Sequence, residues 1–258
     1  MSQTATATHP ATHPKDRIFA AIDTADVARA ARLVEALRGE VGGVKIGNEL
    51  FTAQGPDGVR AVAGGERLFL DLKFHDIPNT VAGAVRSATR LRPFCLTLHA
   101  SGGRAMMQAA AEAAREAAEE LEVARPQLLG VTVLTSLDAA DLEAVGQPGP
   151  VADQVRRLAG LAQDAGLDGV VCSPREIAAL RADRGPGFIL LVPGIRPVWA
   201  ASGDQKRVTT PAEAIAAGAD YLVIGRPIAA QPDPRAAARR IAEELAGAEL
   251  SSTAEPGP

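Results

Sequence analysis

The chain has 258 residues, of which 47% are hydrophobic and 3% aromatic, and its formal net charge is −4. This length suits one large domain whose core is built from aliphatic side chains. There is no basic surplus to neutralise a phosphate backbone, which argues against a nucleic-acid partner. The apolar runs, such as residues 188–192, are far shorter than the roughly 20 residues that cross a bilayer, so no membrane partner is expected.

The two ends of the chain differ in composition from the middle. Residues 1–14 are rich in Thr, Ala, His and Pro and lack the charged start and apolar centre of a signal peptide. We expect a disordered leader over 1–14 and a disordered tail over 249–258, which leaves 15–248 as a single domain. Cys95 and Cys172 lie in apolar strand-like runs, which favours buried thiols in a cytoplasmic protein over a disulfide.

Between these ends, short apolar runs alternate with Ala-rich stretches of helical periodicity. The apolar runs, each expected to be a strand, are 18–22, 44–46, 68–72, 94–98, 128–134, 169–172, 188–192 and 221–224. The helical stretches are 27–37, 56–63, 81–90, 104–121, 151–165, 176–182, 211–217 and 234–245. This alternation predicts right-handed βαβ units with a parallel sheet covered on both faces. The expected fold is therefore an α/β fold of the (β/α)₈ TIM-barrel type, with an open doubly wound sheet as the less suitable alternative.

Charged residues lie at the ends of the second and third expected strands. Active sites of such barrels are built where the strands end. Asp71 and Lys73 are two residues apart, so on a strand their side chains share a face, and the cost of burying a charge predicts that this face is the barrel mouth. Lys45 on the adjacent strand can reach the same space. The chain has only four lysines against 23 arginines, so two lysines at neighbouring strand ends are a notable feature. These residues predict a network of alternating charge; a purely structural salt-bridge network is the plain alternative.

The segments after the seventh and eighth expected strands are suited to binding a phosphate. The first contains Gly194 and Arg196, and the second contains Gly225 and Arg226. Glycine lets backbone N–H groups approach an anion, and arginine supplies a forked donor. Loops at these two positions form a phosphate site in many barrels. The alternative is that they are ordinary turn glycines and surface arginines.

The sequence offers no signal for a metal or an organic cofactor. His75 and His99 stand near strand ends without an acidic partner at metal-binding spacing. The first expected strand is followed by Asp23-Thr24-Ala25 rather than a glycine-rich dinucleotide fingerprint. We therefore expect neither a metal nor an organic cofactor.

The stretch 71–81, DLKFHDIPNTV, resembles the signature of the orotidine 5′-phosphate decarboxylases. The resemblance extends over nearly the whole chain, through residues 22–23, 44–47, 193–197 and 221–227. It implies a cofactor-free enzyme that converts orotidine 5′-monophosphate to UMP and CO₂, the last step of de novo pyrimidine synthesis. The shorter D-x-K-x-x-D pattern also resembles Mg²⁺-dependent barrels acting on sugar phosphates, but those typically carry Glu where Lys45 stands here.

The resemblance also implies roles for individual residues. Lys45, Asp71 and Lys73 match the catalytic charge array, and Asp76 matches an acid supplied by the other subunit of a homodimer. Positions that match substrate contacts are Asp23 for the ribose or base, Lys45 again, Thr80 for the sugar from the neighbouring subunit, Thr135 for the pyrimidine, and Arg196, Gln205, Gly225 and Arg226 for the phosphate. Gln205 would lie on a lid loop over 198–208, where Trp199 is expected to be a packing residue. A non-catalytic barrel that only binds a phosphate ligand is the alternative from another functional class.

Overall fold

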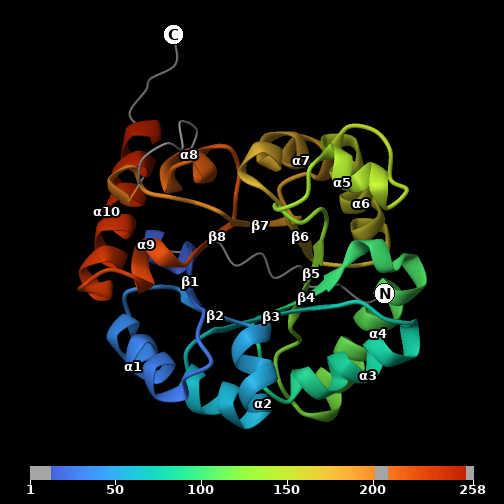
Figure 1. The fold of residues 1–258 in the computed structure, drawn as a ribbon, viewed down its shortest axis with the longest axis horizontal. Helices are drawn as coiled ribbons and strands as arrows, with labels where there is room; N and C mark the ends of the chain where they lie inside the picture. The colour runs from blue at the N-terminus through green and yellow to red at the C-terminus, as the bar shows by residue number, and fades with distance from the viewer. Residues whose placement is uncertain (1–12, 201–208, 254–258) are drawn as a thin grey trace.

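A computed structural model describes residues 13–200 and 209–253, and it shows a closed barrel of parallel strands (Figure 1). The strands are β1 (Ile18–Ile22), β2 (Gly43–Gly47), β3 (Leu68–Phe74), β4 (Cys95–His99), β5 (Gln127–Val131), β6 (Gly169–Val171), β7 (Ile189–Pro193) and β8 (Tyr221–Ile224). Each strand pairs with the next in sequence, and β8 pairs with β1 to close the ring. The predicted (β/α)₈ barrel is confirmed.

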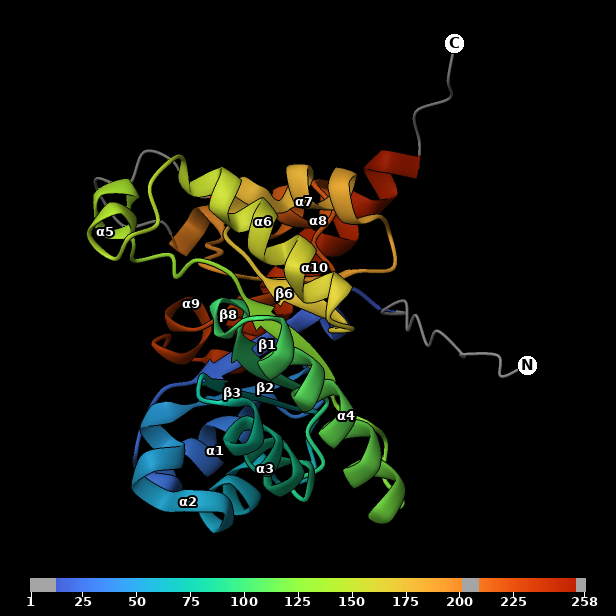
Figure 2. The same ribbon diagram turned by 90° about the vertical axis from the view of Figure 1, so that its right-hand side faces the viewer.

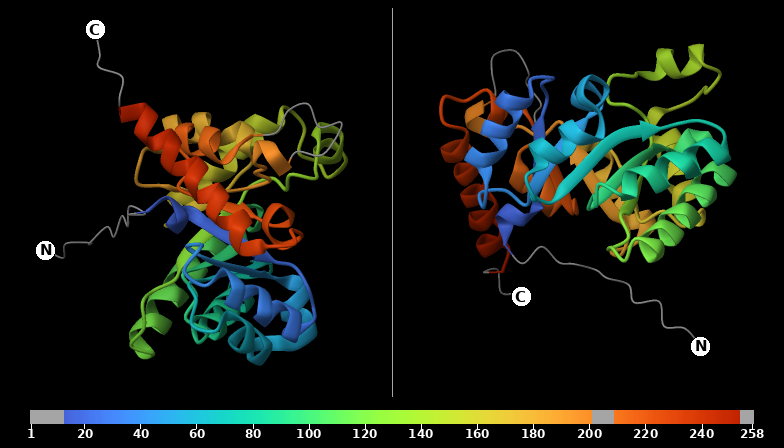
Figure 3. Two further views of the ribbon diagram at one scale, coloured as in Figure 1. Left: turned by 90° about the vertical axis from the view of Figure 1, so that its left-hand side faces the viewer. Right: turned by 90° about the horizontal axis from the view of Figure 1, so that it is seen from below.

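Helices surround the barrel on its outer side (Figure 1). The α-helices are α1 (Val27–Leu37), α2 (Asn48–Ala63), α3 (Pro78–Thr89), α4 (Arg104–Glu120), α5 (Ala139–Ala144), α6 (Val151–Asp164), α7 (Ile177–Arg184), α8 (Pro211–Ala216), α9 (Arg226–Ala229) and α10 (Pro234–Thr253). Short 3₁₀ turns are η1 (Pro14–Arg17), η2 (Ala100–Gly102), η3 (Pro174–Glu176) and η4 (Val198–Ala200). The last helix, α10, packs against α1, α8 and α9 and so completes the ring (Figure 3).

Several boundaries differ from the sequence-based expectation. The strand β5 ends at Val131 rather than at residue 134, and the chain then leads to the short helix α5. Asp138 caps α5 in a capping box with Asp141. The helix has only 6 residues, which is too short for a helical periodicity to show in the sequence. In Figure 2, α5 and α9 lie at one end of the barrel, the end at which the strands finish. The missed helices therefore belong to the face where barrels carry their active sites.

The described elements extend past both expected limits of the domain. The helix α10 continues to Thr253, beyond the limit expected at residue 248. At the other end, Pro14 already belongs to η1. Residues 1–12 and 254–258 lie outside the described part of the chain, so the leader and the tail stay predictions there.

The core has two parts because successive residues of a strand point to opposite faces. A small cluster inside the barrel contains Phe19, Ala21, Phe69, Cys95, Leu129, Leu191, Tyr221 and Val223. A larger aliphatic cluster fills the space between the strands and the helices. Both cysteines are free and buried, and burial raises the pKa of each thiol. Within the described ranges, no helix is both long and apolar enough to cross a bilayer.

An aromatic cluster closes the barrel at the end where the strands begin. The guanidinium carbon of Arg67 lies 3.4 Å from the ring centre of Phe94 and 5.4 Å from that of Phe19. Arg67 also donates a hydrogen bond of 3.1 Å to the hydroxyl of Tyr221. Stacking against aromatic faces together with a hydrogen bond suits a guanidinium removed from bulk water. This end of the barrel is therefore a packed plug.

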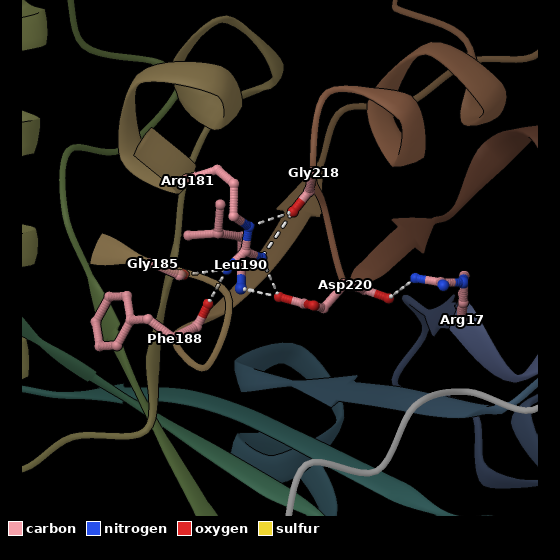
Figure 4. Close-up of polar contacts among 7 residues, drawn as sticks. All are labelled: Arg17, Arg181, Gly185, Phe188, Leu190, Gly218 and Asp220. Atoms are coloured by element: carbon pink, nitrogen blue, oxygen red, sulfur yellow. Dashed lines mark hydrogen bonds and ion pairs between the residues drawn. The ribbon is translucent and has the colours of Figure 1, made fainter. Parts of the chain in front are cut away.

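At the same end, a network of hydrogen bonds around Arg181 and Asp220 joins the starts of β7 and β8 (Figure 4). The Oδ2 atom of Asp220 accepts hydrogen bonds from the backbone N–H of Leu190 and from Arg181, at 2.7 and 2.6 Å. Arg181 also donates to the carbonyl oxygens of Gly185, Phe188 and Gly218. Gly218 has φ +109°, and an added Cβ would lie 2.9 Å from Cγ of Arg181, so a larger residue would be strained there.

The same arrangement recurs between β5 and β6. Asp168 accepts from the backbone N–H of Leu128 at 2.7 Å and from both terminal nitrogens of Arg125. The preceding residues, Gly166-Leu167 and Gly218-Ala219, show the same Gly-x-Asp pattern before β6 and β8. The repeat indicates that these aspartates hold neighbouring strands in register at the stable end of the barrel.

We expect Arg181→Ala to lower the free energy of unfolding by about 3 kcal/mol, because it removes one donor from three carbonyls and the charged partner from the partly buried Asp220. Arg156→Ala is the matched control, since Arg156 pairs with Asp183 on the surface and its loss should cost at most about 1 kcal/mol. Urea unfolding of the two variants measures the difference. Equal losses would contradict the role given to Arg181.

Candidate functional site

A row of alternating charges lies where β2 and β3 end. Oδ2 of Asp71 accepts a hydrogen bond from Nζ of Lys73 at 2.8 Å and lies 3.8 Å from Nζ of Lys45. Nζ of Lys45 also donates to Oδ1 of Asp23, at the end of β1, at 3.2 Å. The side chains of Lys45 and Asp71 are only 12% and 13% exposed, whereas that of Lys73 is 31% exposed. The predicted meeting of Lys45, Asp71 and Lys73 is therefore present in the structure.

The backbone at Lys73 departs from simple strand geometry. Lys73 has φ +52°, a left-handed conformation that few residues other than glycine adopt. The β3–β4 register shifts in the same place, because Leu70 pairs with Leu96 whereas Phe74 pairs with Leu98. The alternation of side chains along a strand therefore explains only part of why Asp71 and Lys73 lie close together. The β-bulge between Leu70 and Phe74 also contributes.

Thr97 on β4 contacts both residues, and it was absent from the sequence-based candidates. Its hydroxyl accepts from the backbone N–H of Lys73 at 3.0 Å and donates to Oδ1 of Asp71 at 2.9 Å. Thr97 is 0% exposed. Threonine is common in strands, so its residue type does not mark it as a candidate. The sequence indicates only that Thr97 shares the inward-facing side of β4 with Cys95 and His99.

Gly225 lies next to this charged row. A Cβ atom added at Gly225 would lie 3.7 Å from Oδ2 of Asp23 and 3.5 Å from Cβ of Ala21. The end of β8 therefore adjoins the Asp23–Lys45 pair. Arg226 follows as the exposed first residue of α9.

The other predicted phosphate residues are placed less completely. Gly194 has φ +80° after β7, and the backbone N–H of Arg196 donates to the carbonyl of Thr209. Neither Arg196 nor Arg226 forms an ion pair with a carboxylate among the residues that the structure describes. Gln205 lies outside the described residues. Thr135 is exposed between β5 and α5, and its contact to a ligand stays a prediction.

Asp76 and Thr80 are not part of the charged row in the described residues of their own chain. Both are exposed at the start of α3, and Oδ1 of Asp76 accepts from the N–H of Ile77 at 2.6 Å. Ile77 is 67% exposed, which is unusual for a large apolar side chain. Within the described chain, no hydrogen bond or ion pair joins Asp76 or Thr80 to Lys45, Asp71 or Lys73.

Two histidines flank the site at the ends of β3 and β4. The ring centres of His75 and His99 are 5.2 Å apart. Burial, followed by the charges of His75 and Lys73, lowers the pKa of His99 below its usual value. Across the described part of the chain, no group of three or more His, Cys, Asp or Glu side chains is arranged to hold a metal ion.

Comparison with known proteins places this barrel in one family. The family model described as "Orotidine 5'-phosphate decarboxylase / HUMPS family" matches residues 16–241. The chain is 58% identical to the orotidine 5′-phosphate decarboxylase of Paramagnetospirillum magneticum over 229 residues, covering 88% of this chain and 97% of that protein. It is also 58% identical to the enzyme of the same name from Rhodospirillum rubrum over 232 residues, covering 89% of this chain and 94% of that protein.

A solved structure shows the same likeness. The crystal structure of orotidine 5′-phosphate decarboxylase from Lactobacillus acidophilus aligns with a TM-score of 0.79 at 35% identity. The alignment covers 88% of this chain and 98% of that one. The match of the family model over residues 16–241 includes all eight strands, from β1 to β8. The chain therefore belongs to the orotidine 5′-phosphate decarboxylase / HUMPS family.

Proposed function

We propose that this protein decarboxylates orotidine 5′-monophosphate to UMP and CO₂ without a metal or an organic cofactor, as the last step of de novo UMP synthesis in the cytoplasm. The observation that carries the proposal is the row Lys45–Asp71–Lys73, held at 3.8 and 2.8 Å at the barrel mouth. The names of the similar proteins support the same substrate. The mechanism must follow from the charges that the chain supplies.

Loss of CO₂ from C6 of the pyrimidine leaves an electron pair on that carbon, so the reaction needs a positive charge there and then a proton. The ammonium of Lys73 supplies both, as it stabilises the carbanion and transfers a proton from Nζ to C6. One such charge pair about 4 Å apart contributes about 4 kcal/mol at an effective dielectric constant near 20. That is too little by itself for an enzymatic rate enhancement.

The remaining stabilisation comes from fixed charges and from the remote phosphate. Asp71 orients the Lys73 ammonium, while Lys45 and Asp23 extend the charged row toward the ribose. Arg196, Gln205, Gly225 and Arg226 hold the phosphate in this proposal, and Thr135 contacts the pyrimidine. Binding energy from the phosphate then acts in the transition state by ordering the site around the substrate.

The same charges make a divalent cation a poor fit. A Mg²⁺-dependent sugar-phosphate enzyme on this barrel needs an acidic oxygen ligand beside Asp71. The neighbouring group here is the Lys45 ammonium, which lies 3.8 Å from Asp71 and would repel a metal ion. A barrel that only binds phosphate ligands would not require a lysine held in a left-handed conformation, which carries a conformational cost.

We also propose that the active site is shared across a homodimer, with Asp76 and Thr80 reaching the substrate of the partner subunit. Both residues are exposed, and among the described residues neither forms a hydrogen bond or an ion pair with Lys45, Asp71 or Lys73, which supports this arrangement. The exposed Ile77 between them supports burial of this segment against another chain. Dimerisation would bring the second acid beside Lys73 without any change of fold.

Lys73→Ala should abolish turnover of orotidine 5′-monophosphate, because it removes both the charge and the proton at C6. The loss of the substrate absorbance band measures the rate. Lys15→Ala is the control, since the Lys15 ammonium binds the carbonyl of Gly39 away from the charged row, and it should keep full activity. If Lys73→Ala keeps more than about a tenth of the activity, a loss below about 1.4 kcal/mol, the assignment of Lys73 as proton donor is wrong.

Mixing inactive Asp76→Asn with inactive Lys73→Ala should restore activity, because the heterodimer then has one intact site. A random mixture should regain up to about a quarter of the wild-type rate. Mixing Lys73→Ala with Lys45→Ala is the control and should regain nothing, because both lysines serve the same site. No recovery in the first mixture, with subunit exchange shown by mass spectrometry, would place Asp76 in its own subunit's site.

A further inference from the structure

The register shift between β3 and β4 leaves the backbone of Lys73 without an ordinary ladder partner. Between Leu70 and Phe74 on β3 there are three residues, whereas only Thr97 lies between their partners Leu96 and Leu98 on β4. In a regular parallel pair, the N–H of Lys73 would donate to a carbonyl of the neighbouring strand. Here it donates to the side-chain hydroxyl of Thr97 at 3.0 Å.

The same hydroxyl also fixes the carboxylate of Asp71. Oδ1 of Asp71 accepts from Thr97 at 2.9 Å, while Oδ2 accepts from Nζ of Lys73 at 2.8 Å. A hydroxyl can accept one hydrogen bond and donate another at once. Thr97 therefore ties the strained backbone of Lys73 to the carboxylate that pairs with the same residue's ammonium.

We propose that Thr97 is a positioning residue of the decarboxylase, which sets the place of the Lys73 ammonium through both of these hydrogen bonds. Thr97 is 0% exposed, so it acts through Lys73 and Asp71 rather than by touching the substrate. This inference rests on the proposed role of Lys73 as proton donor. A shift of a catalytic group by about 1 Å can cost about a hundredfold in rate.

The threonine side chain suits this task better than other small residues. Its β-branch restricts χ1, so the hydroxyl is held toward β3 rather than free to rotate. Valine has nearly the same shape but offers neither donor nor acceptor, and it would leave the N–H of Lys73 without a partner. Serine keeps the hydroxyl and loses only the methyl group. These differences separate the effect of the hydrogen bonds from that of packing.

The test compares Thr97→Val and Thr97→Ser with the matched control Thr89→Val. Thr89 is also 0% exposed, and its hydroxyl donates to the carbonyl of Val85 within α3, away from the charged row. For Thr97→Val we expect kcat to fall by about 10- to 100-fold, with KM and UMP affinity unchanged. Thr97→Ser should recover most of this loss, and Thr89→Val should keep the wild-type kcat. The melting temperature of Thr97→Val should fall further than that of Thr89→Val, because only the former leaves a buried backbone N–H without a partner.

A wild-type kcat in Thr97→Val would overturn the inference, and so would a loss that serine does not restore. Should Thr97→Val fail to fold, Thr97→Ser and Thr97→Ala take its place: a clearly higher kcat for serine supports the role, and equal values overturn it. The two proposals fail in different ways. A wild-type protein without turnover removes the proposed function, whereas wild-type turnover with an active Thr97→Val variant removes only the role of Thr97.

Discussion

Asp71 shares one carboxylate oxygen between two ammonium groups, at 2.8 Å from Lys73 and 3.8 Å from Lys45. The side chains of Lys45 and Asp71 are only 12% and 13% exposed, and burying a charge is costly unless an opposite charge lies beside it. In the proposed mechanism, this arrangement holds the positive charge of Lys73 in place before the substrate binds. Preorganised charge of this kind acts without reorganisation during the reaction.

The rest of the barrel keeps this row in place. At the opposite end, Arg67 lies in an aromatic cluster, and Asp168 and Asp220 fasten neighbouring strands. At the mouth, the β3 bulge gives Lys73 a conformation that costs free energy in isolation. The N-terminal end of the barrel therefore provides stability, and the C-terminal end carries the strained residue of the candidate site, as is usual in barrel enzymes.

Much of this could be predicted from the sequence, because the determining features are local. Apolar runs alternating with helical stretches were sufficient for the barrel, and the Asp71–Lys73 spacing in an apolar strand indicated the mouth. The β3–β4 register shift could not be predicted, since it depends on pairing between strands more than 20 residues apart. Thr97 looks like an ordinary residue until that pairing is known, and Asp220 does so until the pairing of β7 with β8 is known. Helix α5 was missed because six residues are too few for a periodic signal.

In the proposed mechanism, the protein's own charges carry out the decarboxylation. Its most direct test is the ultraviolet absorbance of orotidine 5′-monophosphate mixed with the purified wild-type protein in excess EDTA. This mechanism predicts rapid loss of the substrate band and formation of UMP, at a rate that added Mg²⁺ does not change. No turnover by folded protein, or turnover that appears only when Mg²⁺ is restored, would contradict it.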